Sequence, residues 1–383
     1  MNVKLSKIAE IIMGQSPDGS SYNTNRAGLP LLNGAADYKG NEFNPKKYTI
    51  APKKISQKGD ILMGIRATIG NLAISDKEYC IGRGLAAIRV NEGVCKEYII
   101  HYLSEQIKTL AYNSSGSTIK GIVKEDLYDM QIPLPPLPVQ KRIAEILDAA
   151  DTLRRKDLEL LKKYDELAQA IFIDMFGDPV RNEKGWEVGS FGDYITVLTD
   201  YHSNGSYETL RDHVKLSNVP DYALMVRTTD LEKNNFIENV NYISKEAYEY
   251  LDKSKVYGGE IIINKIGSAG NIYLMPNLNK PVSLGMNAFL VRLNDSLNPV
   301  FAYYFLNTDF GKYEISKRVF GAVTKTITKE AVRSIPMFRI PIKQQENFAK
   351  SIGIINNIYS FDIGGQSNIL FQSLLQKAFK GDL

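Results

Sequence analysis

The chain of 383 residues is 44% hydrophobic and 23% charged, which predicts a folded protein of two or three domains and argues against a disordered, collagen-like or purely coiled-coil chain. Its 47 Lys and Arg against 43 Asp and Glu give a net charge of only +4, so a polyanionic partner would have to be met by local basic clusters. Two cysteines and three histidines argue against a disulfide framework and a metalloenzyme, and we expect no metal site and no cofactor.

The N-terminal residues 1–7 lead into a short mixed segment without the apolar core of a signal peptide. No window of the sequence approaches the roughly 18 uncharged apolar residues that a membrane-spanning helix needs. We therefore expect a cytoplasmic protein that does not associate with a membrane.

Residues 1–136 read as short apolar runs separated by Gly, Pro, Asn and Asp, with a strand-like run at 60–65 and a helical stretch at 97–110. This mixture predicts a compact α/β or α+β domain. Polar loops follow the strand-like run, at 66–71, and the helical stretch, at 114–120.

A proline stop at 133–138 ends this region, and residues 139–175 then run without Gly or Pro. A helix of this length extends about 55 Å at 1.5 Å per residue. Its apolar residues recur in steps of three and four, which is typical of a coiled-coil seam, at Ile146, Ala150, Leu153, Leu160, Tyr164, Leu167 and Ile171. We therefore predict a long helix over 137–177.

The second half of the sequence repeats the first. Three blocks match in the same order at nearly constant offset: 58–63 with 258–263, 69–71 with 269–271, and 116–125 with 321–330. The last offset also carries Pro136 onto Pro341 and Gln140 onto Gln345. We therefore predict a second globular domain over 178–341 and a second long helix over 342–383. Adjacent glycines at 364–365 cost about 2 kcal/mol in a helix and predict a kink or a break there.

A lone amphipathic helix cannot bury its apolar stripe, and two such helices of similar length most economically pack against each other. We therefore predict an α/β protein in which two globular domains are separated by two long antiparallel coiled-coil helices, with an internal pseudo-two-fold repeat. The alternative is that each helix is an ordinary core helix lying on its own domain.

The order globular, helix, globular, helix, together with the run IPLPPLPVQKRIA at 132–144, resembles the specificity subunits of type I restriction-modification systems. Further matching features are FIDMFGD at 172–178 and KAFKGDL at 377–383, and the resemblance covers the whole chain. It implies two target-recognition domains, 1–136 and 178–341, each reading one half of a bipartite double-stranded DNA target. The helices at 137–177 and 342–383 would set the spacer between the halves.

The same resemblance implies a subunit that does no chemistry of its own. It would recruit two modification (methyltransferase) subunits through the helices and their flanks, and restriction subunits through them.

Candidate DNA contacts are loop residues with amide, hydroxyl or basic side chains, because amide and guanidinium groups read base edges while lysines mostly meet phosphates. In the first domain they are Gln15, Ser16, Arg66, Thr68, Asn71, Ser117 and Lys120. In the second they are Tyr201, His202, Lys265, Ser268, Asn271, Thr324 and Lys325. Equivalent loops with unlike side chains are what two readers of different half-sites need. The simpler interpretation, which we favour for Gly70 and Gly270, is that the glycines make turns.

The sequence lacks the motifs of the enzymatic alternatives. It has no Gly-x-x-x-x-Gly-Lys-Ser/Thr phosphate loop and no Asp/Asn-Pro-Pro-aromatic tetrapeptide, so we predict neither an ATPase nor an amino-methyltransferase. No paired acidic cluster with a lysine supports a nuclease. The remaining alternative is a coiled-coil scaffold protein that binds protein partners only.

Overall fold

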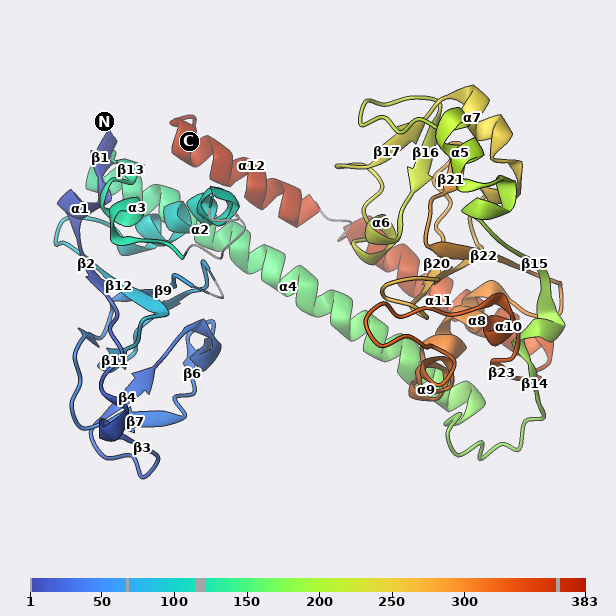
Figure 1. Cartoon of the computed structure of the whole chain (residues 1–383), viewed down its shortest axis with the longest axis horizontal. Coiled ribbons are helices and arrows are strands. Elements are labelled where there is room, and N and C mark those ends of the chain that lie inside the picture. The colour runs from blue at the N-terminus through green and yellow to red at the C-terminus, as the bar shows by residue number, and fades with distance from the viewer. Residues whose placement is uncertain (1, 67–68, 114–120, 363–365) are drawn as a thin grey trace. The chain divides into compact units, whose positions relative to one another are not determined.

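The computed structural model describes the chain except for residue 1 and residues 67–68, 114–120 and 363–365, and describes 108–113 and 356–362 by their backbone alone. The chain divides into two compact units (Figure 1). Unit 1 comprises Met1–Glu159 and Ile363–Leu383, and unit 2 comprises Leu160–Asp362. The first long helix, α4 (Leu137–Phe176), contributes its beginning to unit 1 and its end to unit 2.

Unit 1 contains a four-stranded antiparallel sheet of order β10-β9-β12-β2, whose strands are Leu72–Ile74, Ile61–Gly64, Leu85–Val90 and Ala9–Met13. A second sheet has the order β3-β7-β4-β11-β8, with strands Tyr22–Asn23, Lys47–Thr49, Leu29–Leu32, Tyr79–Ile81 and Ile55–Ser56. Two strand pairs complete the unit's β-structure: β1 (Asn2–Lys4) with β13 (Gln131–Pro133), and β5 (Tyr38–Lys39) with β6 (Glu42–Phe43). Its globular helices are α1 (Leu5–Ile8), α2 (Lys96–Asn113) and α3 (Lys124–Tyr128).

Strand β9 is buried on both faces. Successive side chains of a strand point to opposite sides, so its residues enter two different cores. Ile61 and Met63 lie in one core with Tyr98 of α2, whereas Leu62 lies in a second core with Ile81 of the other sheet. The continuous apolar run of the sequence is therefore a strand enclosed between a helix and a second sheet.

Unit 2 repeats this arrangement. Its first sheet has the order β15-β22-β19-β20, with strands Ile195–Asp200, Ala288–Leu293, Ile261–Asn264 and Ile272–Leu274. Its second sheet has the order β17-β16-β21-β18, with strands Asn241–Ile243, Ala223–Val226, Val282–Leu284 and Lys255–Val256. Strands β14 (Val188–Ser190) and β23 (Pro336–Phe338) form a separate pair.

The globular helices of unit 2 are α5 (Tyr207–His213), α6 (Thr228–Glu232), α7 (Lys245–Tyr250), α8 (Pro299–Asn307), α9 (Asp309–Ser316) and α10 (Lys329–Arg333). Strand β19 alternates as β9 does, with Ile261 and Ile263 in the core beneath α8 and Ile262 in the core shared with the second sheet. The predicted α/β class and the internal repeat are confirmed.

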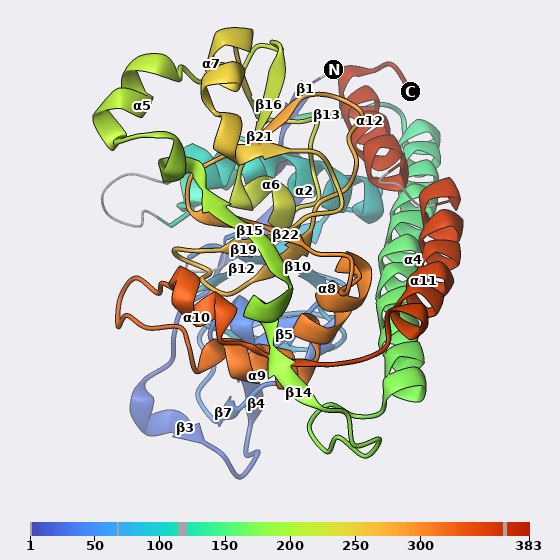
Figure 2. The ribbon, with the colours of Figure 1, turned by 90° about the vertical axis from the view of Figure 1, so that its right-hand side faces the viewer.

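The long helices pack in pairs within each unit (Figure 2). In unit 1 the beginning of α4 shares a core with the last helix, α12 (Gln366–Lys380), through Ile143, Leu147, Phe371 and Leu375. In unit 2 the end of α4 packs on the beginning of α11 (Ile342–Asp362), through residues that include Phe172, Phe176 and Phe348. The beginning of α4 packs on α12, and its end packs on α11, which precedes α12 in the chain. The predicted antiparallel arrangement is therefore confirmed.

The buried face of α4 differs from the predicted seam. Of the seam residues only Ala150 is fully buried, and Leu153, Leu160 and Leu167 are exposed to 46%, 36% and 46%. The buried apolar positions of α4, of which only Ala150 belongs to the predicted seam, are Ile143, Ala144, Leu147, Ala150, Ala168, Phe172 and Phe176. Steps of three and four also fit this second stripe, and the choice between the two is made by the globular helices α2 and α8, which cover it. Each long helix is therefore partly a core helix of a unit, as the alternative interpretation proposed.

A buried glutamine joins each long helix to the globular part that precedes it. The side chain of Gln140 accepts a hydrogen bond from the Cys95 backbone N–H (2.9 Å) and donates one to the Pro135 carbonyl oxygen (2.7 Å). Gln345 does the same in unit 2, with the Asn298 N–H (2.8 Å) and the Ile340 carbonyl oxygen (2.6 Å). Both glutamines thus hold the start of a globular helix against the start of a long helix.

Candidate nucleic-acid interface

Equivalent backbone hydrogen bonds close the predicted loops at 66–71, of which 67–68 lie outside the described residues, and at 265–271. In unit 1 the Gly70 N–H donates to the Gly64 carbonyl oxygen at 2.8 Å, and in unit 2 the Gly270 N–H donates to the Asn264 carbonyl oxygen at 2.8 Å. Both glycines have positive φ, +91° and +89°, a region that favours glycine. The turn role that we favoured for Gly70 and Gly270 therefore agrees with their conformation.

These glycines also make room for a helix. A Cβ built on Gly70 would lie 2.1 Å from Cγ2 of Ile107 in α2, and one on Gly270 would lie 2.5 Å from Cγ2 of Ile315 in α9. The hairpin loops are thus held against a helix in both units, so their neighbouring polar side chains start from a fixed backbone.

We expect Gly70→Ala to lower the free energy of unfolding by about 2 kcal/mol, because alanine disfavours positive φ and the new methyl group collides with Ile107. The control is Gly34→Ala, since Gly34 has extended backbone and open space around its Cβ position. Urea denaturation of both variants is the measurement. Equal midpoints for the two variants would contradict the assigned role of Gly70.

A second predicted loop lies beside the hairpin loop in unit 2. The Gly267 N–H donates to the Lys325 carbonyl oxygen (3.0 Å), and the Ile327 N–H donates to the Lys265 carbonyl oxygen (3.1 Å). In unit 1 the Ile122 N–H donates to the Ile65 carbonyl oxygen (2.9 Å), which is the equivalent bond at the end of the 114–120 loop. In unit 2 the fold therefore brings two loops that are far apart in sequence to the same edge. In unit 1 it brings Ile122 beside Ile65, and residues 114–120 lie outside the described residues.

Most described candidates expose their side chains. Exposed residues are Gln15, Arg66, Asn71, His202, Ser268, Asn271, Thr324 and Lys325, and Ser16 is half-buried. Thr68, Ser117 and Lys120 lie outside the described residues. Amides, hydroxyls and cations thus gather on loops, and they differ between the two units, with Arg66 where unit 2 has Ile266.

Two candidates are engaged within unit 2. The Tyr201 ring is 8% exposed and lies in a core with Leu210 and Ala247, and the Lys265 ammonium group forms an ion pair with Asp200 at 2.8 Å. Burial alone would raise the pKa of Asp200, but hydrogen bonds from Lys265 and Ser203 outweigh it and hold that pKa below its usual value. This carboxylate therefore stabilises the fold at neutral pH, and the contribution is lost as the pH falls through the lowered pKa. The pair ties the end of β15 to the hairpin loop.

Sequence reasoning missed a third loop at the same edge. The Ile65 N–H donates to the Gly84 carbonyl oxygen (2.9 Å), which places the Gly-Arg-Gly segment 82–84 beside the hairpin loop, with Arg83 exposed. In unit 2 the Lys265 N–H donates to the Asn287 carbonyl oxygen (2.7 Å) in the equivalent place. A basic residue between two glycines that separate two strands is the signal that would have revealed Arg83.

Comparison with known proteins shows what the chain is similar to. Residues 1–167 match the family model described as type I restriction modification DNA specificity domain. The putative type I restriction enzyme MjaX specificity subunit of Methanocaldococcus jannaschii is 44% identical over 41% of this chain and 38% of that protein. The type I restriction enzyme EcoBI specificity subunit of Escherichia coli is 21% identical over 100% of this chain and 86% of that protein. The chain is similar to type I restriction enzyme specificity subunits.

The similarity in fold to a solved S subunit extends over nearly the whole chain. The crystal structure of the S subunit of a type I restriction-modification system from M. genitalium aligns over 99% of this chain and 96% of that one, with a TM-score of 0.53 and 15% identity. The match to the M. jannaschii protein spans well under half of that relative's length. The predicted resemblance is confirmed, and these relatives are named specificity subunits, in agreement with the prediction that the chain is not an enzymatic subunit.

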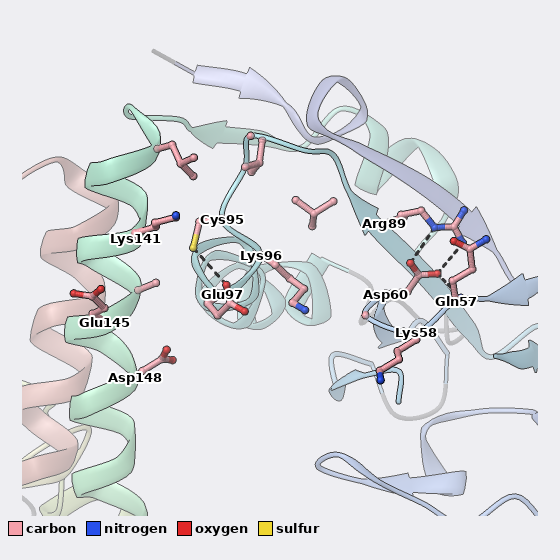
Figure 3. A pocket seen from close by; sticks show the side chains of 16 residues that line it. Gln57, Lys58, Asp60, Arg89, Cys95, Lys96, Glu97, Lys141, Glu145 and Asp148 are labelled. Carbon is pink, nitrogen blue, oxygen red and sulfur yellow. Dashed lines mark hydrogen bonds and ion pairs between the residues drawn. The ribbon is translucent and has the colours of Figure 1, made fainter. Parts of the chain in front are cut away.

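A pocket of about 740 Å³ in unit 1 lies between α2, α4 and the turn before β9 (Figure 3). One wall carries Asp60, whose carboxylate oxygens accept from Arg89 at 3.0 and 2.9 Å. The opposite side carries Cys95 and Glu97. Burial raises the pKa of the Cys95 thiol, which opposes formation of the nucleophilic thiolate. Asp60 and Arg89 therefore form a structural pair, and the buried Cys95 is not activated as a nucleophile.

In the part of the chain that the structure describes, no group of three or more His, Cys, Asp or Glu is arranged to hold a metal ion. Within the same residues, no helix has the length and apolar character needed to cross a membrane.

Proposed function

We propose that this chain is the DNA-recognition subunit of a type I restriction-modification complex, and that it binds double-stranded DNA with a bipartite target. Residues 1–136 read one half-site and residues 178–341 read the other. The helices at 137–177 and 342–383 set the number of unread base pairs between them. The observation that carries this proposal is that both units build the same loop edge from equivalent hydrogen bonds, yet present different side chains on it.

The chemistry of the exposed side chains supports DNA as the ligand. Guanidinium and amide groups such as those of Arg66, Asn71 and Asn271 match the donor and acceptor pattern of base edges. Lys325 offers an ammonium group to a phosphate. Tyr201 and Lys265 contribute by supporting the loops, since one is buried and the other is paired with Asp200.

The helices suit a ruler and a docking surface. A 40-residue α-helix is about 60 Å long, and one turn of DNA is about 34 Å, so the helices have the length to separate half-sites by roughly one turn. Exposed apolar residues remain along α4, among them Leu153, Leu158 and Leu167. Two modification subunits dock on these helices and their flanks, and restriction subunits join through them. Chemistry on DNA belongs to those partners.

The test is DNA binding by the complex of this chain with its modification subunits. Specific retention of a bipartite duplex should fall by several orders of magnitude between 50 and 200 mM salt, because each phosphate contact releases counterions. A scaffold that binds proteins only would assemble the complex without sequence-specific retention, and that result would reject the proposal.

Exchange of residues 1–136 for the equivalent domain of a relative should alter one half-site and leave the other unchanged. The expectation follows because each unit has its own cores and its own loop edge. Mapping of methylated adenines in cells that carry the hybrid is the measurement. A hybrid that alters both half-sites would contradict independent reading.

A further inference from the structure

The loop at 318–325 in unit 2 ends in a narrow, fixed turn. Phe320 and Thr326 exchange two backbone hydrogen bonds, of 3.0 and 2.8 Å, and Thr326 is also bridged to Ile266 of the hairpin loop. Gly321 has φ of +106°, and a Cβ there would lie 2.2 Å from the Thr324 carbonyl oxygen. The five residues between Phe320 and Thr326 therefore form a tight turn with a defined apex.

This turn presents apolar side chains to solvent. Val323 near its apex is 98% exposed, and Phe320 and Ile266 on the adjoining bridged segments are 55% and 38% exposed. Val323 is followed directly by the exposed polar side chains of Thr324 and Lys325. A fully exposed valine contributes nothing to the core of unit 2. Packing within the unit therefore does not explain why an apolar residue stands at this position.

Under the proposed function, the ligand that the exposed Val323 would contact is DNA. In the major groove, base edges display hydrogen-bonding groups and one apolar group, the C5-methyl of thymine. A valine cannot donate or accept a hydrogen bond, but its methyl groups can exclude water from that methyl group. A wedge between base steps is normally a larger side chain, such as Phe, Leu, Ile or Met.

We infer that Val323 contacts the C5-methyl group of a thymine in the half-site that unit 2 reads. The inference rests on the proposed function, and it assigns a specificity-determining role to a residue that carries no polar group. Lys325, two residues later, holds the turn to the DNA backbone, and the hydrogen bond between Gly267 and Lys325 fixes the turn against the hairpin loop.

The first unit has different chemistry at the matching position of its sequence. At the offset of 205 residues, Val323 corresponds to Thr118, which carries a hydroxyl group. A valine and a threonine have similar size but differ in hydrogen bonding, so the two half-sites should differ in their dependence on a thymine methyl group.

The experiment replaces each thymine of the half-site for unit 2 by deoxyuridine, one at a time, which removes the methyl group and leaves every hydrogen bond of the base. The complex with modification subunits is titrated with these duplexes, using the unmodified chain, Val323→Ala and the control Val219→Ala. Val219 is 70% exposed and lies outside the loops of the edge, so the control makes the same substitution at an exposed position away from the inferred DNA contact.

For the unmodified chain and for Val219→Ala we expect one thymine whose replacement weakens binding roughly fourfold, the change that burial of one methyl-sized group supports. Val323→Ala should bind the natural duplex about fourfold more weakly and should lose the penalty at that thymine alone. Its salt dependence should stay unchanged, because no phosphate contact is removed.

Two results would overturn the inference. If the unmodified chain binds its bipartite target specifically but no thymine replacement in that half-site matters, or if Val323→Ala keeps the full penalty, Val323 does not read a methyl group. If the unmodified complex does not distinguish its target from unrelated DNA, the proposed function fails as well. The binding of the natural duplex thus separates the two failures.

Discussion

Insertion of four residues into each long helix should shift the preferred target to one with a longer gap and leave both half-sites unchanged. The insertions belong between residues 159 and 160 and between 362 and 363, where the chain divides into its two units. Four helical residues add about 6 Å, which corresponds to about two base pairs of DNA. Specific binding to the original target should fall about a thousandfold, towards the level of non-specific DNA.

The expectation depends on packing that stays within each unit. Phe371 and Leu375 pack on the beginning of α4 in unit 1, and Phe348 packs on its end in unit 2, so the insertions interrupt neither core. The control is an insertion in α4 alone, which mismatches the two helices and should weaken binding to targets of every gap length. Methylation mapping of the double insertion gives the gap directly, and an unchanged gap would show that the helices are not the ruler.

Gln140→Leu and Gln345→Leu should each lower the free energy of unfolding of the affected unit by about 2–5 kcal/mol. Each glutamine is at least 98% buried and satisfies one backbone N–H and at least one backbone carbonyl. Leucine fills a similar volume but leaves both backbone groups without these partners, and an unpaired buried group costs about 1–3 kcal/mol.

Denaturation followed by circular dichroism measures this effect, with Gln169→Leu as the control. Gln169 lies on the same helix α4 as Gln140, but its side chain is exposed, so the same substitution there should change stability by less than about 0.5 kcal/mol. If Gln140→Leu were as mild as the control, the hydrogen bonds of Gln140 would not hold the helix to the globular part.

The duplication allowed much of the fold to be predicted from particular residues. The runs around Ile61 and Ile261 match in apolar pattern, in the acidic residue before them and in the glycine after them, and they fold into the same strand and hairpin. The helical stretch predicted at 97–110 is α2, within a few residues at its ends. These features are local, since strand alternation, helix periodicity and a glycine turn all act over a few residues.

The same reasoning did not find which face of α4 is buried. Ile143, Leu147 and Ala150 follow the same steps of four and three as Ile146, Ala150 and Leu153, so periodicity alone permits either stripe. The choice is made by α2 and α12 in unit 1 and by α8 and α11 in unit 2, all of which are distant in sequence from the residues they cover.

Local sequence also did not reveal which side chains at the loop edge are exposed and which are paired or buried. Lys265 and Lys325 are both basic residues in polar loops, yet one is paired with Asp200 and the other is exposed. Tyr201 and His202 are neighbours, yet the first lies in a core and the second is exposed. Lys265 pairs with a residue 65 positions away, and Tyr201 lies in a core that includes residues of α5 and α7. The sequence on either side of Lys265 or Tyr201 does not indicate these distant contacts.

The sequence by itself determined the internal repeat, the α/β class, the long helices and the loops in which polar side chains cluster. These features arise from short-range sequence patterns that occur in both halves of the chain. The tertiary structure alone decided that three loops of unit 2 meet at one edge, that Gln140 and Gln345 lock the helices to their globular parts, and that an exposed valine occupies the apex of a turn. These depend on hydrogen bonds and packing between segments tens of residues or more apart, whose pairing is settled only when the whole core closes.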